Sequence, residues 1–175
     1  MAKTESKKIW TIGHSTHTIE EFIRLLQAFQ IKLLVDIRSY PGSKRYPQFN
    51  KENLATSLHS AGIDYIHMPA LGGRRKPLPG STNTNWQNKA FRGYADYMQT
   101  DEFKNGIKEL EQHALKQQTV YMCAEALWWR CHRSLVSDYL KDAGWTVLHI
   151  MSLTKSEEHP YTTVARNRQG NLFTD

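Results

Sequence analysis

The chain has 175 residues, 39% of them hydrophobic, and a formal net charge of +6, which fits a single domain with one hydrophobic core. No apolar run approaches the roughly 18 residues that a membrane-spanning helix needs, and no signal-peptide pattern follows the basic N-terminus. We therefore expect a cytoplasmic protein with no membrane partner. Two cysteines are too few for a disulfide scaffold, so we expect both to be reduced.

The hydrophobic pattern alternates short strands with helices. Strands are expected over 9–13, 32–37, 63–67, 118–122 and 145–150, and helices over 19–29, 51–61, 90–116 with a break near Thr100, and 132–143. Strands separated by helices pair in parallel through crossover connections. The sequence thus predicts one α/β domain over 1–175, a three-layer α/β/α fold with a mainly parallel sheet of about five strands. Its core spans about 9–150, and the tail 151–175 is polar and weakly patterned.

Local signals support several of these boundaries. Thr18 and Glu21 have capping-box spacing, and Gly62 and Gly144 stand where helices are expected to stop. The segment 68–87 is long, irregular and rich in Pro, Gly, Ser, Thr and Asn. Such a loop in a compact domain is usually functional or disordered, and this one could close over a ligand.

The most informative stretch is YMCAEALWWRCHRS, residues 121–134. It places Cys123 and Glu125 at the end of a buried strand, and Cys131 and His132 at the start of the next helix. Ligands of α/β folds bind at the carboxyl ends of strands, beside helix N-termini. This stretch is therefore the first candidate for a functional site.

Other polar residues also follow strand ends, which lie on one edge of a parallel sheet, so one crevice could collect them. We assign catalytic roles to His14, Asp36, Cys123, Glu125, Cys131 and His132, and ligand contacts to Ser15, Arg38, Ser39, His67, Gly72, Gly73, Arg74, Arg130 and Arg133. Purely structural roles are also open at several positions. Asp36 could simply pair with Arg38, His67 and His149 could be satisfied core histidines, Gly72-Gly73 could be a turn, and Trp128-Trp129 could be packing.

The motifs TIGHS (11–15), DIRSYP (36–41), HMPALGGRR (67–75) and MCAEALWWRCHR (122–133), followed by HI (149–150), resemble the family known as domain of unknown function 488. The resemblance extends from about Ile9 to Ile150. It implies an α/β fold and a prokaryotic cytoplasmic protein, and it implies no settled activity.

A weaker similarity links the chain to rhodanese and cysteine-phosphatase domains. It would make Cys123 a nucleophile, Arg130 or Arg133 an anion-binding arginine, and Asp36-Ile37-Arg38 the early motif. The chain departs from the phosphatase signature because six residues, not five, separate Cys123 from Arg130. Glu125 and the two tryptophans also suit an anion cradle poorly.

Four chemistries remain open. Cys123 or Cys131 could act as a nucleophilic or redox thiol, or Glu125 and Asp36 could act as carboxylates assisted by His14. We expect no cofactor, although Cys123, Cys131 and His132 could instead hold zinc. A non-enzymatic nucleic-acid-binding module would use basic groups with exposed Trp86, Phe91 or Tyr94 for stacking. We expect an anionic, phosphate-bearing ligand, either a nucleotide or a nucleic acid.

Overall fold

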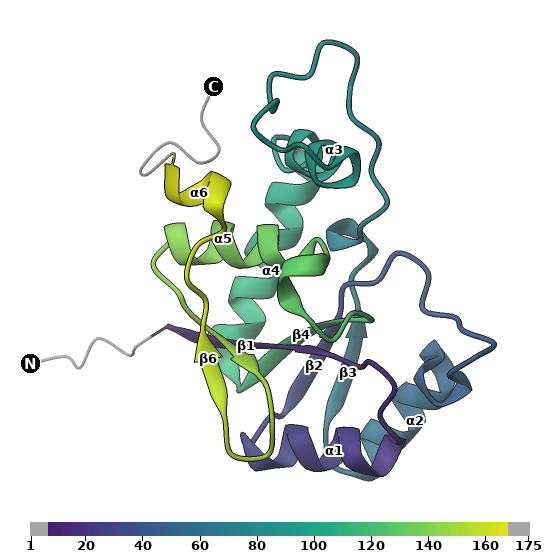
Figure 1. Ribbon diagram of the computed structural model, residues 1–175. Coiled ribbons are helices and arrows are strands. Elements are labelled where there is room, and N and C mark those ends of the chain that lie inside the picture. Colours follow the sequence, from purple (N-terminus) through teal and green to yellow (C-terminus); the bar gives the residue numbers. More distant parts are fainter. Residues whose placement is uncertain (1–6, 168–175) are drawn as a thin grey trace, which may run out of the picture.

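The computed structural model describes residues 7–167 and is built on a six-stranded sheet with the order β3-β2-β4-β1-β5-β6 (Figure 1). The strands are β1 (Lys8–Gly13), β2 (Leu33–Asp36), β3 (Asp64–His67), β4 (Thr119–Cys123), β5 (Thr146–Ile150) and β6 (Ser156–Glu158). The first five pair in parallel and β6 runs antiparallel to β5. The mainly parallel sheet and its five predicted strands are confirmed.

Helices cover both faces of the sheet, which confirms the three-layer prediction (Figure 1). They are α1 (Ile19–Ala28), α2 (Lys51–Ser60), α3 (Lys89–Tyr97), α4 (Asp101–Lys116), α5 (Arg133–Asp142) and α6 (Thr163–Asn167), with 3₁₀ turns η1 (Pro47–Phe49), η2 (Pro69–Leu71) and η3 (Trp128–Arg130). Side chains alternate between the two faces of β2, so the strand contributes to two hydrophobic clusters. Leu34 packs in the cluster with α1 and α2, whereas Leu33 and Val35 pack in the cluster with α3, α4 and α5.

The predicted helix boundaries have visible causes. Thr18 Oγ1 accepts a hydrogen bond from the Glu21 backbone N–H at 3.1 Å, which caps α1. Thr100 caps α4 through the Phe103 N–H and so separates α3 from α4. Gly62 and Gly144 follow α2 and α5 with φ of +77° and +95°, a conformation that favours glycine.

The C-terminal segment is more ordered than its composition predicts. Residues 151–167 were expected as a polar tail, yet they contain β6, α6 and the fully buried His159. The strand was missed because its sequence, SEE, has only three residues and no apolar alternation. Residues 168–175 of the predicted tail lie outside the described range. Within that range, no helix combines the length and apolar character that crossing a membrane requires.

The register brings the predicted strand ends level with one another. Gly13 of β1 lies opposite Cys123 of β4, and Asp36 of β2 lies between Met122 and His67. His149 is opposite Thr11, inside the sheet rather than at this edge. The carboxyl ends of β1, β2 and β4 therefore form one rim.

Candidate functional site

A cavity of about 560 Å³ opens at this rim. It lies between the segments that follow β1, β2 and β4 and the beginning of the segment 72–88. It is lined by His14, Ser15, Thr16, Arg38, Ser39, Tyr40, Gly42, Ser43, Tyr46, Gly73, Arg74, Cys123, Ala124, Glu125, Ala126, Cys131 and His132. The volume and the polar and charged side chains among the lining residues suit a small ligand that carries polar groups.

Two free thiols face each other in the cavity wall. Cys123 Sγ lies 2.8 Å from Cys131 Sγ, and the backbone N–H of Arg133 points at Cys131 Sγ at 3.4 Å. Burial raises the pKa of Cys123, but the hydrogen bond from Cys131 and the charge of Arg133 outweigh it and lower that pKa to about 7. Burial and the neighbouring Cys123 raise the pKa of Cys131. The two shifts have opposite directions, so Cys123 is the more acidic thiol of the pair.

Arg133 fixes the loop that follows Cys123. Its Nη2 donates to the carbonyl oxygens of Glu125 and Ala126 at 2.9 and 3.2 Å. The carbonyl of Ala124 in turn accepts from the Ser15 N–H at 3.0 Å. The carbonyl of Cys123 likewise accepts from the His14 N–H at 3.0 Å. In trans peptides, the N–H groups of Ala124, Glu125 and Ala126 point away from the carbonyls of the residues that precede them, and those three carbonyls all have donors within the protein.

The N–H groups of this loop are available to a ligand. Among residues 7–167, the backbone N–H groups of Ala124, Glu125 and Ala126 have no hydrogen-bond partner within the protein. All three residues line the cavity and are exposed. Successive free N–H groups in a loop form a concavity that binds anions.

Two neutral histidines complete the wall. His14 is buried, stacks on Phe49 at 4.3 Å between ring centroids and donates from Nδ1 to the Ser15 carbonyl at 2.9 Å, which leaves Nε2 as the proton acceptor. His132 donates from Nε2 to the Ile37 carbonyl at 2.9 Å. Burial lowers the pKa of each histidine to about 4, so both are uncharged at neutral pH.

Arg38 reaches the cavity from a buried ion pair beneath it. Its Nη2 lies 2.7 Å from Asp36 Oδ2, and its Nε donates to Asp36 Oδ1 at 2.9 Å. Asp36 also accepts from the Tyr65 hydroxyl at 2.6 Å. Burial and the charge of Asp36 raise the pKa of Tyr65. The carboxylate of Asp36 is therefore occupied by two partners, and it does not line the cavity.

The family model described as "Domain of unknown function DUF488" matches residues 18–140. The chain belongs to this family. The DUF488 match includes Arg38, Arg74, Cys123 and His132 of the cavity, whereas His14 and Ser15 precede it. Comparisons with curated proteins and with solved structures found no match. The local similarity to rhodanese and cysteine-phosphatase domains stays a prediction.

Most of the residues assigned from sequence meet in the cavity of this DUF488 protein. Ten of them line it, namely His14, Ser15, Arg38, Ser39, Gly73, Arg74, Cys123, Glu125, Cys131 and His132. Five do not. Asp36, Gly72 and Arg133 lie buried behind the wall, and Arg130 is exposed away from the lining. His67 lines a neighbouring cavity of about 450 Å³ and bonds the Arg38 carbonyl at 2.7 Å.

Sequence reasoning missed several residues that line the cavity. Ala124 and Ala126 carry no side-chain signal, and Tyr40, Ser43 and Tyr46 sit in an irregular loop. One usable signal was Gly13 at the end of β1. A Cβ there would lie 1.7 Å from the Glu125 carbonyl oxygen, so the glycine marks a close backbone approach.

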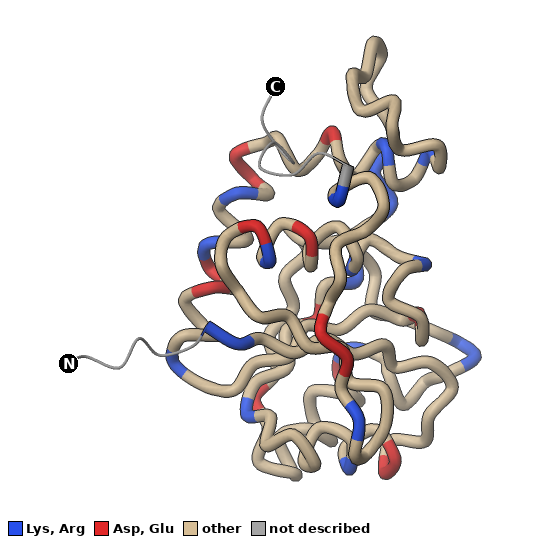
Figure 2. Tube along the Cα trace, turned by 60° about the vertical axis from the view of Figure 1, so that its left-hand side comes forward, with Lys and Arg blue, Asp and Glu red and all other residues tan. Residues whose placement is uncertain are grey.

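The aromatic residues expected to stack nucleic-acid bases are not exposed, and that prediction was wrong. Tyr94 and Trp86 are buried, and Phe91 is half-buried against Trp86. Hydrophobic packing between α3, α4 and α5 outcompeted solvent exposure at these positions. Lys and Arg are spread along the chain and interleaved with Asp and Glu (Figure 2).

The structure also places His149, the tryptophan pair and the residues considered for zinc. His149 is a buried core histidine, and Trp128 packs on it with ring centroids 4.8 Å apart. Trp129 is 48% exposed, so only Trp128 of the pair is packing. Over residues 7–167, no cluster of three or more His, Cys, Asp and Glu is arranged to hold a metal ion. The Nε2 of His132, one of the three zinc ligands considered, is engaged by the Ile37 carbonyl.

Proposed function

We propose that the cavity binds a small anionic, phosphate-bearing ligand and that Cys123 is the nucleophile of a thiol-dependent transferase or hydrolase. One observation carries the proposal: the Cys123 thiol lies in the cavity wall, 2.8 Å from the Cys131 thiol, and the charge of Arg133 acts on it. A thiol with a pKa of about 7 is substantially ionised at neutral pH, and the thiolate is the reactive form.

The charge around the cavity supports an anionic ligand. Arg133 is 1% exposed and makes no ion pair with a carboxylate among the described residues. Its Nε also lacks a hydrogen-bond partner there. A buried guanidinium without a counter-ion favours negative charge nearby, which a Cys123 thiolate and a bound anion would supply. Arg74 adds a second, exposed positive charge at the entrance.

The lining residues fit a two-step displacement. In the first step, Cys123 Sγ would form a bond to the electrophilic atom of the substrate, and the bond from that atom to its leaving group would break with its electron pair. In the second step, water or another acceptor would displace the group from sulfur. Neutral His14, with Nε2 free, would take the proton of that attacking molecule.

A carboxylate mechanism has less support in the geometry. Glu125 lines the cavity but is exposed, and no side-chain partner among residues 7–167 orients it. Asp36 is held by Arg38 and Tyr65 outside the lining. A general acid or base has to be held within reach of its proton, so the thiol is the better candidate.

Alkylation by iodoacetamide as a function of pH, resolved to each cysteine by peptide mass, tests the proposal. We expect Cys123 to react with a midpoint near pH 7 and inorganic phosphate to slow that reaction. Cys131→Ala removes the hydrogen bond to Cys123 Sγ and should raise the midpoint. Because thiolate is the reacting species, a native protein in which both cysteines stay inert until unfolding would contradict the proposal.

A further inference from the structure

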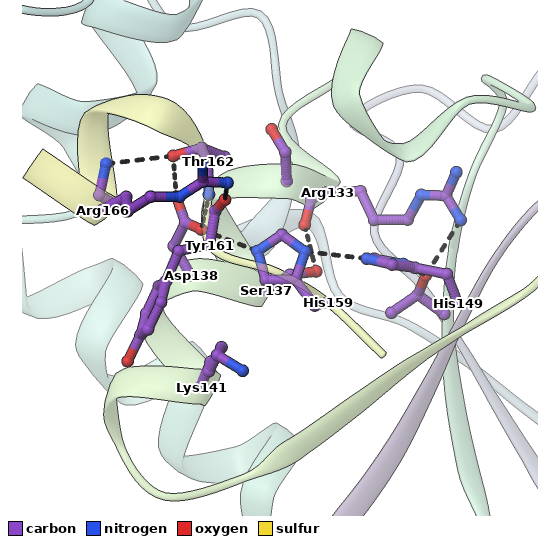
Figure 3. A network of polar contacts seen from close by, with 12 residues as sticks. Arg133, Ser137, Asp138, Lys141, His149, His159, Tyr161, Thr162 and Arg166 are labelled. Atoms are coloured by element: carbon purple, nitrogen blue, oxygen red, sulfur yellow. Dashed lines mark hydrogen bonds and ion pairs between the residues drawn. The ribbon is translucent and has the colours of Figure 1, made fainter. Parts of the chain in front are cut away.

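A continuous chain of buried hydrogen bonds runs from the C-terminal segment to the loop that follows Cys123. Asp138 Oδ1 lies 2.7 Å from His159 Nε2, and His159 Nδ1 lies 2.9 Å from His149 Nε2. His149 Nδ1 lies 2.5 Å from Thr11 Oγ1, which accepts from Arg133 Nη1 at 3.1 Å. Figure 3 shows the two imidazole rings between Asp138 and Arg133.

When both imidazole rings are neutral, the two ends of this series determine the direction of each hydrogen bond in it. Arginine can only donate and a carboxylate can only accept. With neutral imidazoles, the one arrangement that uses every group has Arg133 donating to Thr11, Thr11 to His149, His149 to His159, and His159 to Asp138. Burial is the largest cause that lowers the pKa of His149, to about 2, and the charge of Arg133 acts in the same direction, which agrees with a neutral His149 ring.

The chain has no access to the solvent and takes no part in the proposed chemistry directly. Its five side chains are each at most 1% exposed, and none lines the cavity. Its contact with the site is Arg133, whose other terminal nitrogen holds the carbonyls of Glu125 and Ala126. Trp128, from the same connection between β4 and α5, packs flat on the His149 ring, which gives the loop a second contact with the chain.

We propose that Thr11, His149, His159 and Asp138 are positioning residues that hold the Arg133 guanidinium against the Cys123 loop, so that its charge reaches the thiol and the N–H groups of the loop face the ligand. The inference rests on the proposed function, because it concerns the same thiol and the same loop. It extends the site to β5 and to the segment after β6. His149 and His159 both lie beyond the residues 18–140 that the family model matches.

Thr11 is the best place to interrupt the chain. Thr11→Val keeps the size and the β-branched shape that suit a central strand, and it removes only the hydroxyl that joins Arg133 to His149. Thr11→Ser restores that hydroxyl and is the conservative rescue. Ile63→Val, a buried truncation in the cluster with α1 and α2, is a control for a general loss of stability.

The measurement is the iodoacetamide alkylation rate of Cys123 against pH, taken together with the melting temperature. If Arg133 shifts in Thr11→Val, the midpoint of Cys123 alkylation should rise by about one pH unit. The alkylation rate at pH 7 should then fall about fivefold, because the rate is proportional to the fraction of Cys123 present as thiolate. Thr11→Ser should return both to wild-type values. Ile63→Val should lower only the melting temperature.

The outcomes separate this inference from the proposed function. A wild-type Cys123 without a midpoint near pH 7 would contradict the proposed function itself. The wild-type midpoint could be near pH 7 and stay unchanged in Thr11→Val, whatever the melting temperature of that variant. This result would show that the hydrogen-bonded series only stabilises the fold, and it would overturn the inference. An equal change in Thr11→Ser would overturn it too, because the hydroxyl would then not be the cause.

Discussion

At the scale of single residues, the site depends on how closely two backbone segments approach. Gly13 lies opposite Cys123 in the sheet, and the space that its Cβ would occupy is filled by the carbonyl of Glu125. That carbonyl is also a hydrogen-bond acceptor for Arg133. The absence of a side chain at residue 13 is therefore what lets the loop reach its position over β1.

We predict that Gly13→Ala displaces the loop. The added Cβ would meet backbone atoms at 1.7 and 2.5 Å, which no rotamer change can relieve, so we expect a loss of about 1–3 kcal/mol in the free energy of unfolding and slower alkylation of Cys123. Urea unfolding and the alkylation rate measure the two effects. Gly106→Ala is the matched control, since its Cβ would meet only side-chain atoms at 3.2 Å or more. Unchanged stability in Gly13→Ala would refute the close approach.

Much of the cavity lining could be predicted from the sequence, because polar residues that directly follow a predicted strand can be recognised there. Cys123, Glu125 and His14 could be assigned from their positions alone. The roles of Arg133 and the Ala124 N–H could not, because they depend on the path of a loop. Arg133 was expected to touch the ligand, but the structure buries it behind the loop.

At the scale of elements, the segment between η2 and α3 is held against α3 by hydrogen bonds. Asp96 on α3 accepts hydrogen bonds from the Leu78 N–H, the Ser81 hydroxyl and the Asn83 side chain, at 2.6 to 2.9 Å. Gly93 lets the Arg75 carbonyl approach the helix closely. Sequence patterns located this segment, but its docking on α3 depends on long-range contacts that periodicity does not encode.

We predict that Asp96→Asn loosens residues 78–83. The amide nitrogen cannot accept a hydrogen bond, so at least one of the three is lost, at a cost of about 1–3 kcal/mol. Hydrogen exchange of the Leu78 amide, compared with that in the exposed-site variant Asp64→Asn, measures the effect. Wild-type protection of that amide together with a wild-type free energy of unfolding would contradict the assignment.

The same carboxylate adds a pH dependence. Burial raises the pKa of Asp96, but the hydrogen bonds from Asn83, Leu78 and Ser81 outweigh it and lower that pKa below its usual 3.8. The contribution of the Asp96 carboxylate to the free energy of unfolding is thus fully present above pH 3.8, and it is lost as the pH falls through the lowered pKa. Asp96→Asn should lack this component of acid unfolding.

At the scale of the whole molecule, the fold holds three histidines in a neutral state. His14 and His132 line the cavity, and His149 belongs to the buried chain of hydrogen bonds. Burial is the main cause that lowers their pKa values, to about 4, 4 and 2. They come from β5 and from the segments after β1 and before α5. Several parts of the sheet therefore contribute to the free-energy difference between the neutral and protonated folded protein.

This arrangement predicts a loss of stability in mild acid. Below the unfolded pKa of about 6.5, the unfolded chain binds protons that the folded chain does not, so the free energy of unfolding falls as the pH decreases. Each such histidine contributes about 1.4 kcal/mol per pH unit, and the three together about 4 kcal/mol per unit between roughly pH 6 and 5. The slope becomes smaller as the pH approaches the folded pKa of His14 and His132, about 4. The total loss down to about pH 4 is thus at most about 8 kcal/mol, which would unfold a domain at the lower end of the ordinary stability range of about 5–15 kcal/mol.

Urea unfolding at several pH values between roughly 7 and 4.5 measures this slope. His132→Gln keeps a donor for the Ile37 carbonyl but cannot bind a proton, so the slope should fall by about one proton's share, while the exposed-site variant His59→Gln should keep the wild-type slope. A free energy of unfolding that stays constant from about pH 6.5 to 5 would mean that the folded protein protonates these rings. The cavity wall would then be positively charged under those conditions, and the role of His14 as a neutral proton acceptor would fail with it.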